Sequence, residues 1–90
     1  MRPTPDQQLA LEAMLNRFLG AAVYDRLCLG MTVGSIDEGI LNIFVSTENC
    51  AADIEHNYSD QFAIAAEHVF RLPIRSVNIL PRDFSDSTED

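Results

Sequence analysis

The residues of this chain that could do chemistry are few, and they form no familiar catalytic or metal-binding motif. Among 90 residues there are two cysteines, two histidines and no lysine. His56 and His68 are twelve residues apart on one predicted helix, which is more than three turns, so they cannot share a metal ion. Cys28 and Cys50 are not spaced as a CxxC pair, and we expect two free thiols. Without lysine there is no P-loop lysine and no Schiff-base amine.

Carboxylates and histidines on the same predicted helix are the other candidates for catalysis. Asp53 with His56, and Asp60 with Glu67, are acid and base pairs by residue type. Charged residues on the outer face of a helix are usually a solvated surface, however. The sequence also has no glycine-rich phosphate loop, nucleophile elbow, zinc-protease motif or calcium loop. We therefore predict that the chain is not an enzyme and has no cofactor and no metal site.

The charge of the chain argues against nucleic acid as a partner. Six arginines stand against fourteen acids, giving a formal net charge of −8. Binding to DNA or RNA needs a cationic track that releases counterions from phosphates, and we expect no nucleic acid binding by this chain alone. There is no apolar run of about 18 residues and no basic leader. The sequence thus predicts a cytoplasmic protein with no membrane partner.

The elements that position these residues are predicted in the order helix, helix, strand, strand, helix, strand. Thr4 is a good N-cap for the first helix, with Pro5 at the first helical position and Gly20 at the end. The second helix is short, Ala21 to Leu29, and Gly30 ends it.

A hairpin follows the two helices. Met31 to Ile36 alternates as a strand, Asp37-Glu38-Gly39 forms the turn, and Ile40 to Val45 returns. Gly34 inside the first strand predicts a bulge or a close backbone approach. The hairpin is the most clearly marked local structure in the chain.

One long helix then runs from the capping residues Ser46 to Asn49 as far as Leu72, where Pro73 stops it. Its predicted core stripe contains Ala51, Ile54, Tyr58, Phe62, Ala65 and Val69. Glu55 falls inside this stripe. Either the first turn overhangs the sheet, which we prefer, or the helix starts later.

Ile74 to Leu80 is the third strand, parallel to the second because a helix connects them. The hairpin strand can lie between them, which gives the sheet order two, one, three. At this length the chain builds one small core. We predict an α+β fold, ααββαβ, with helices on one face of a three-stranded sheet. The domain is residues 1–81, and residues 82–90 are an acidic tail or the start of a linker.

The first helix has a second, smooth face. Leu11, Leu15, Phe18 and Leu19, with Met14 at the margin, gather on the predicted core side. Leu9, Ala10 and Ala13 fall on the other side. They are either ordinary exposed surface or a patch that packs on another copy or a partner.

An isoleucine on the outer face of the long helix has no evident folding role. Ile64 lies about 160° from the core stripe by the helical period. Around it are Asp53, Asp60, Glu67 and Arg71. Ile64 is either a stray exposed residue or a contact anchor rimmed by charge, which is the usual anatomy of a protein interface.

Three segments resemble the N-terminal domain of the bacterial replication initiator DnaA. They are the stretch from Leu19 to Leu27, the strand from Gly39 to Ser46, and the helix from Ala52 to Tyr58. That family has an aromatic residue opening a short helix, a strand with alternating leucines, and a helix that reaches a tyrosine after several charges. The similarity covers about Leu9 to Leu80.

The chain departs from the family at residues that the family uses for contact. The family's two tryptophans are replaced by Leu27 and by Asp53 or Ile54, and its acidic residue before the short-helix aromatic is Val23. The aromatic at the start of the long helix is Asn49. The resemblance therefore implies the fold more strongly than it implies the partner.

The resemblance implies a KH-like module that works by contact. In the family this domain self-associates, helps to bring the replicative helicase to the origin and docks regulators, while ATP and duplex DNA belong to later domains. We expect a protein-interaction module that contacts its partner, a replicative helicase, initiator or regulator, through Leu9, Ala13, Asp60, Ile64 and Glu67. Two alternatives stay open: a KH-like single-stranded nucleic acid binder or helicase loader resembling DciA, and a plain homodimeric structural domain.

Overall fold

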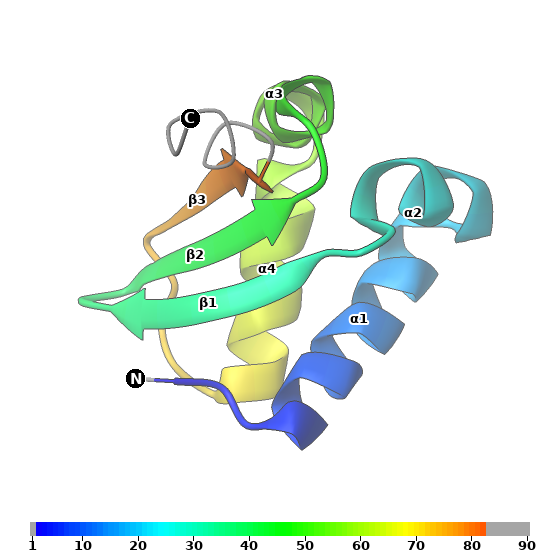
Figure 1. The fold of residues 1–90 in the computed structure, drawn as a ribbon. Coiled ribbons are helices and arrows are strands. Elements are labelled where there is room, and N and C mark those ends of the chain that lie inside the picture. The colour runs from blue at the N-terminus through cyan, green and yellow to red at the C-terminus, as the bar shows by residue number, and fades with distance from the viewer. Residues whose placement is uncertain (1, 83–90) are drawn as a thin grey trace.

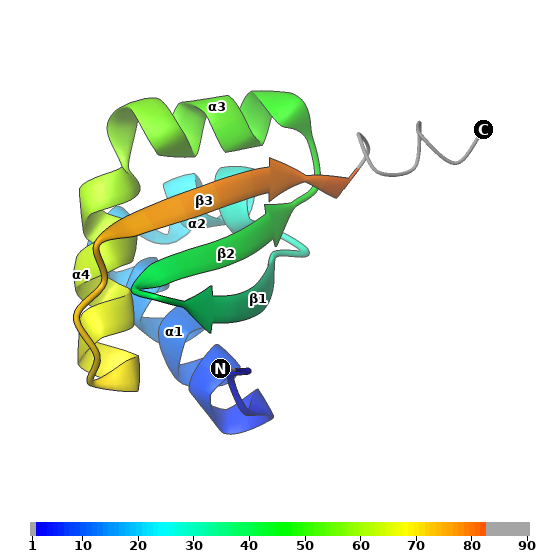
Figure 2. The ribbon, with the colours of Figure 1, turned by 90° about the vertical axis from the view of Figure 1, so that its left-hand side faces the viewer.

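Four helices and three strands follow one another over residues 2–82, the part of the chain that this computed structural model describes. Their order is α1 (Pro5–Leu19), α2 (Ala21–Cys28), β1 (Thr32–Asp37), β2 (Ile40–Val45), α3 (Glu48–Asn57), α4 (Ser59–Phe70) and β3 (Ser76–Pro81). The helices lie on one face of the three-stranded sheet and leave the other face open (Figures 1 and 2). The predicted α+β class and the order of its elements are thus confirmed.

The caps of α1 and α3 explain where these helices begin. The Thr4 hydroxyl accepts a hydrogen bond from the Gln7 backbone N–H, while the Gln7 side chain accepts one from the Thr4 N–H. Thr47 caps α3 by accepting from the Cys50 N–H. In each case the side-chain oxygen satisfies a backbone donor that has no partner inside the helix.

The predicted strand order was wrong. The sheet runs β1-β2-β3, with β1 and β2 antiparallel and β2 and β3 parallel. The antiparallel hairpin of β1 and β2 and the parallel direction of β2 and β3 were predicted correctly, but β1 was wrongly placed between β2 and β3. The centre of a sheet favours the strand with the most continuous apolar character, and β2 (Ile40–Val45) buries Leu41, Ile43 and Val45 completely. The bulged, glycine-containing β1 lies at the edge instead.

The bulge predicted at Gly34 is present. The register of β1 against β2 shifts between Val33 and Ile36. A Cβ on Gly34 would come within 3.0 Å of the Asn42 carbonyl oxygen and of a ring carbon of Phe44. Only glycine allows this close approach without movement of the strand.

The single long helix predicted after the hairpin is two helices. Tyr58, with φ −132° and ψ 8°, separates α3 from α4. Its neighbours Asn57 and Ser59 are weak helix formers, which favours a break at this point. The change of direction lets α3 pack chiefly on β3 while α4 packs on α1. Because α3 begins at Glu48 and Glu55 is exposed, the late-start alternative for this helix is excluded.

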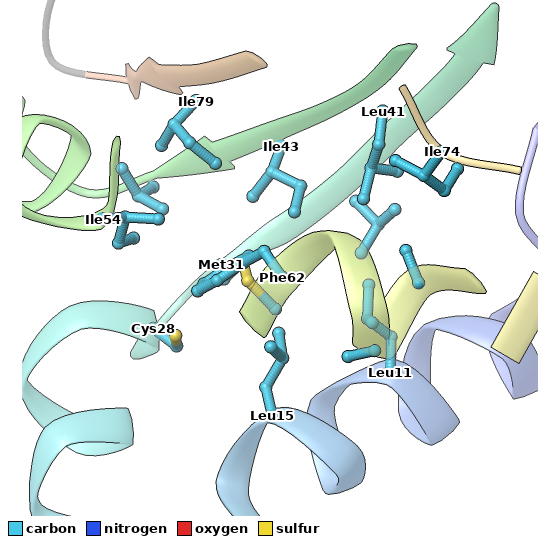
Figure 3. Close-up of a cluster of buried hydrophobic side chains, with 14 of the residues drawn as sticks. Leu11, Leu15, Cys28, Met31, Leu41, Ile43, Ile54, Phe62, Ile74 and Ile79 are labelled. Carbon is cyan, nitrogen blue, oxygen red and sulfur yellow. The ribbon is translucent and has the colours of Figure 1, made fainter. Parts of the chain in front are cut away.

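The core lies between the sheet and the helices. Phe62 of α4 occupies its middle, between Ile43 of the sheet and Leu15 of α1 (Figure 3). All three side chains are fully buried. No buried side-chain polar atom of the described residues lacks a hydrogen-bond partner, so this small interior carries no desolvation penalty of that kind.

Arg82 ties the end of β3 to the beginning of β1. Its guanidinium donates hydrogen bonds to the Gly30 carbonyl and to the Thr32 hydroxyl, the latter at 2.6 Å. Arg82 is the one residue of the predicted acidic tail that the structure describes, and residues 83–90 of that tail lie outside the described residues.

Candidate interaction surface

Ile64 lies on the outer face of α4, away from the sheet. Its side chain is 48% exposed. Asp60 precedes it by one helical turn and His68 follows it by one turn, and both are exposed. The position predicted from the helical period is confirmed, and the role of Ile64 as a contact stays a prediction.

A hollow lies between α1 and α4, and one of the residues that line it is one helical turn from Ile64. Met14, Arg17 and Phe18 of α1 and His68 of α4 line it. Since Ile64 and His68 are four residues apart, they share one side of α4. We call this surface, made of Met14, Arg17, Phe18, Ile64 and His68, the α1–α4 surface.

Phe18 was predicted to be in the core, and this prediction was wrong. The side chain is 44% exposed. The two fully buried residues of α1 are Leu11 and Leu15, and Phe18 sits one turn further, where it lines the hollow instead of the core. Its large apolar ring lines the same hollow as His68, which is one helical turn from Ile64, and no residue pattern in the sequence indicates this meeting of α1 and α4.

Leu9 and Ala13 are exposed, as predicted, but they are not part of the hollow. Leu9 is 63% exposed, and by the helical period it lies about 160° from Leu11. Neither Leu9 nor Ala13 is among the residues that line the hollow. The structure therefore separates the predicted contact residues into two surfaces, one on α1 alone and one between α1 and α4.

Glu67 has a structural contact that the sequence did not indicate. Its Oε2 accepts a hydrogen bond of 2.9 Å from the backbone N–H of Ile74. This bond closes the segment that connects α4 to β3, around Pro73. Glu67, which was predicted to lie at the edge of an interface, thus stabilises the connection between α4 and β3.

The open face of the sheet carries a row of polar side chains. Asn78 donates to the Asn42 Oδ1 at 3.1 Å, Asn42 donates to the Ser35 carbonyl at 3.2 Å, and the Ser35 hydroxyl donates to Asp37 at 2.8 Å. The hydrogen bond from Ser35 lowers the pKa of the Asp37 carboxyl. Sequence patterns missed this row, because it depends on the parallel pairing of Asn42 with Asn78.

The thiols are not arranged for reactivity. Burial raises the pKa of the Cys28 thiol to about 12, which disfavours the nucleophilic thiolate. The Cys50 thiol donates a weak hydrogen bond, 3.5 Å long, to the Arg26 carbonyl. Both cysteines are free.

An ion pair joins α2 to α3. Arg26 donates to Asp53 at 2.7 Å, and Asp53 also accepts from Asn57 at 2.6 Å. The hydrogen bond from Arg26, with that from Asn57, lowers the pKa of the Asp53 carboxyl. The Asp53 carboxylate is therefore engaged in contacts within this domain.

Residues 2–82 contain no group of three or more His, Cys, Asp or Glu side chains placed to hold a metal ion. Within the same residues, no helix has the length and apolar character needed to cross a membrane. The comparison with models of known protein families finds no match, and neither does the comparison with curated proteins.

Proposed function

We propose that this domain is a protein–protein interaction module of the cytoplasm that acts in, or regulates, the initiation of DNA replication. The observation that carries the proposal is the α1–α4 surface, where the half-exposed Phe18 lines a hollow and the half-exposed Ile64 is one helical turn from His68 of the same lining. Large apolar side chains surrounded by charge are typical of interface anchors. The resemblance to the DnaA N-terminal domain suggests the process, and a replicative helicase, an initiator or a regulator as the partner.

The direct test is binding between the purified domain and purified replication proteins of the same organism. We expect the helicase or the initiator to be retained by the immobilised domain. Ile64→Asp should weaken this retention by about tenfold or more, since a central anchor is lost. Leu29→Asp is the matched control, because Leu29 is 72% exposed, is the C-cap residue of α2 and does not line the hollow. Equal loss with both variants, or retention of neither protein, would contradict the proposal.

A second candidate function is single-stranded nucleic acid binding or helicase loading of the DciA kind. The observation in its favour is the open sheet face. Phe44 follows Asn42 on the same face of β2, Asn42 is hydrogen-bonded to Asn78, and Arg82 lies at the end of the sheet. An aromatic ring and amides on an open sheet are suited to stacking and base contacts. A fluorescence titration with single-stranded oligonucleotides distinguishes the two candidates. Tight binding that weakens as salt rises would favour this second function, and its absence favours the first.

A further inference from the structure

We infer that the α1–α4 surface is the docking site of an acidic amphipathic helix of a partner protein. This inference rests on the proposed interaction function and adds the chemistry of the partner. It comes from three features of the surface: its charge, its shape and its poor fit to a second copy of the chain.

The charge of the hollow is opposite to that of the chain. Its lining contains Arg17 and His68 and no carboxylate. Three other hollows of the described surface include carboxylates: Glu38 in one, Glu55 with Asp60 in another, and Glu48 with Glu55 in a third. A fourth, at β1, contains Arg2 and no carboxylate, but its only large apolar side chain is Phe44. In a chain with a net charge of −8, the hollow is therefore a place where an acidic segment meets Arg17 and no carboxylate of the lining, while Asp60 lies at the margin of the surface, one helical turn from Ile64.

The shape of the surface matches a helix. Met14 and Phe18 are four residues apart on α1, and Ile64 and His68 are four apart on α4, so each helix presents a ridge one turn long. The two helices pack side by side, which places the ridges about 8–10 Å apart at the helix axes. A groove of this kind takes the apolar side chains of an amphipathic helix at i, i+3, i+4 and i+7.

A second copy of this chain is a poorer occupant. In a twofold symmetric pair the same patch meets itself. Arg17 of each copy would meet a lining that itself contains Arg17 and no carboxylate to compensate. Like charges across an interface disfavour that association. The surface therefore fits a partner that supplies the acidic residues.

The test uses two synthetic helical peptides and the whole chain. Both peptides carry leucine and phenylalanine at i, i+3, i+4 and i+7, and the remaining positions are glutamate in one and lysine in the other. Fluorescence anisotropy should show binding of the glutamate peptide at least about tenfold tighter than of the lysine peptide. Added salt should weaken it.

Variants locate the binding site. Arg17→Glu and Ile64→Asp should each weaken binding of the glutamate peptide by about tenfold, while Leu29→Asp leaves it unchanged. Arg17→Gln, which removes the positive charge without introducing a negative one, should give a smaller loss in the same direction. Circular dichroism melting of each variant shows that the fold is retained.

Three results would overturn the inference. They are equal binding of the two peptides, insensitivity to Arg17→Glu, and a dimer in light scattering that Ile64→Asp abolishes. These failures differ from failure of the proposed function. If the domain retains a helicase or an initiator but binds the two peptides equally, the proposed function stands and the inference of an acidic partner is contradicted. If the domain prefers the glutamate peptide but retains neither protein, the acidic partner stands and the proposed function is contradicted.

Discussion

Glu67 stabilises the connection between α4 and β3 through its hydrogen bond to the Ile74 N–H. Glu67→Ala should lower the free energy of unfolding by about 1–2 kcal/mol, because the Ile74 N–H then loses its acceptor in a part-buried position. Glu67→Gln keeps an acceptor oxygen and should cost less than half as much. Urea denaturation followed by circular dichroism measures both variants.

Glu48→Ala is the control for the loss of one exposed carboxylate. If all three variants had the same stability, the hydrogen bond to Ile74 would not contribute, and Glu67 would return to the set of candidate contact residues. Retention of the partner protein by Glu67→Gln, measured in parallel, separates a role in the turn from a role in binding.

Residue patterns predicted exposure better than they predicted contacts. The helical period placed Ile64 and Leu9 in solvent, as found, because it reports the side of a helix on which a residue lies. It placed Phe18 in the core and missed the bond of Glu67. Both errors depend on which residues of a helix are covered by the neighbouring parts of the fold. The residue pattern of one helix carries no information about that packing.

At the level of elements, the sequence predicted local features such as helix caps and the strand bulge correctly, but it predicted the order of the strands in the sheet wrongly. The cap at Thr4 and the bulge at Gly34 follow from local chemistry and were predicted. For α3 the sequence offered Ser46 to Asn49 as capping residues, and the structure selects Thr47. The strand order was wrong because chain direction alone does not decide which strand is central. The break at Tyr58 was missed because the apolar period continues through it from Ile54 to Phe62.

The ion pair between α2 and α3 gives a prediction with a pH dependence. The pKa of Asp53 is lowered by its hydrogen bond from Arg26, so the pair stabilises the fold above the unfolded carboxyl pKa of about 3.9. This contribution is lost as the pH falls through the lowered pKa of the folded state. Asp53→Asn should therefore be less stable than the wild type at pH 7, and the difference should disappear in acid well below pH 4. Denaturant midpoints at both pH values measure it.

Asp60→Asn is the matched control, since Asp60 is exposed on α4 and away from Arg26. Salt provides a second check, because the Arg26 and Asp53 side chains both reach solvent and should be screened. A difference between Asp53→Asn and the wild type that persisted in acid would assign the effect to packing instead of charge.

For the whole molecule, the sheet and the helices divide the surface into distinct regions. The open sheet face carries the hydrogen-bonded row of Asn78, Asn42 and Ser35. At one end of the sheet, Arg82 links the end of β3 to the start of β1. The helical side carries the α1–α4 surface and, around α1, the face of Leu9 and Ala13. Two apolar surfaces on one helical layer allow self-association and partner binding to be separate properties of a single small domain.

The face of Leu9, Ala10 and Ala13 is our candidate for self-association. Small residues let another helix approach closely, and Leu9, 63% exposed, provides the apolar anchor. We expect light scattering at high concentration to show a mass rising from the 10.0 kDa monomer toward the dimer. Leu9→Asp should restore the monomer, because it places two carboxylates in the contact, whereas Ile64→Asp should leave the mass unchanged. A monomer at every concentration, or a mass equally sensitive to both substitutions, would contradict this division of the surface.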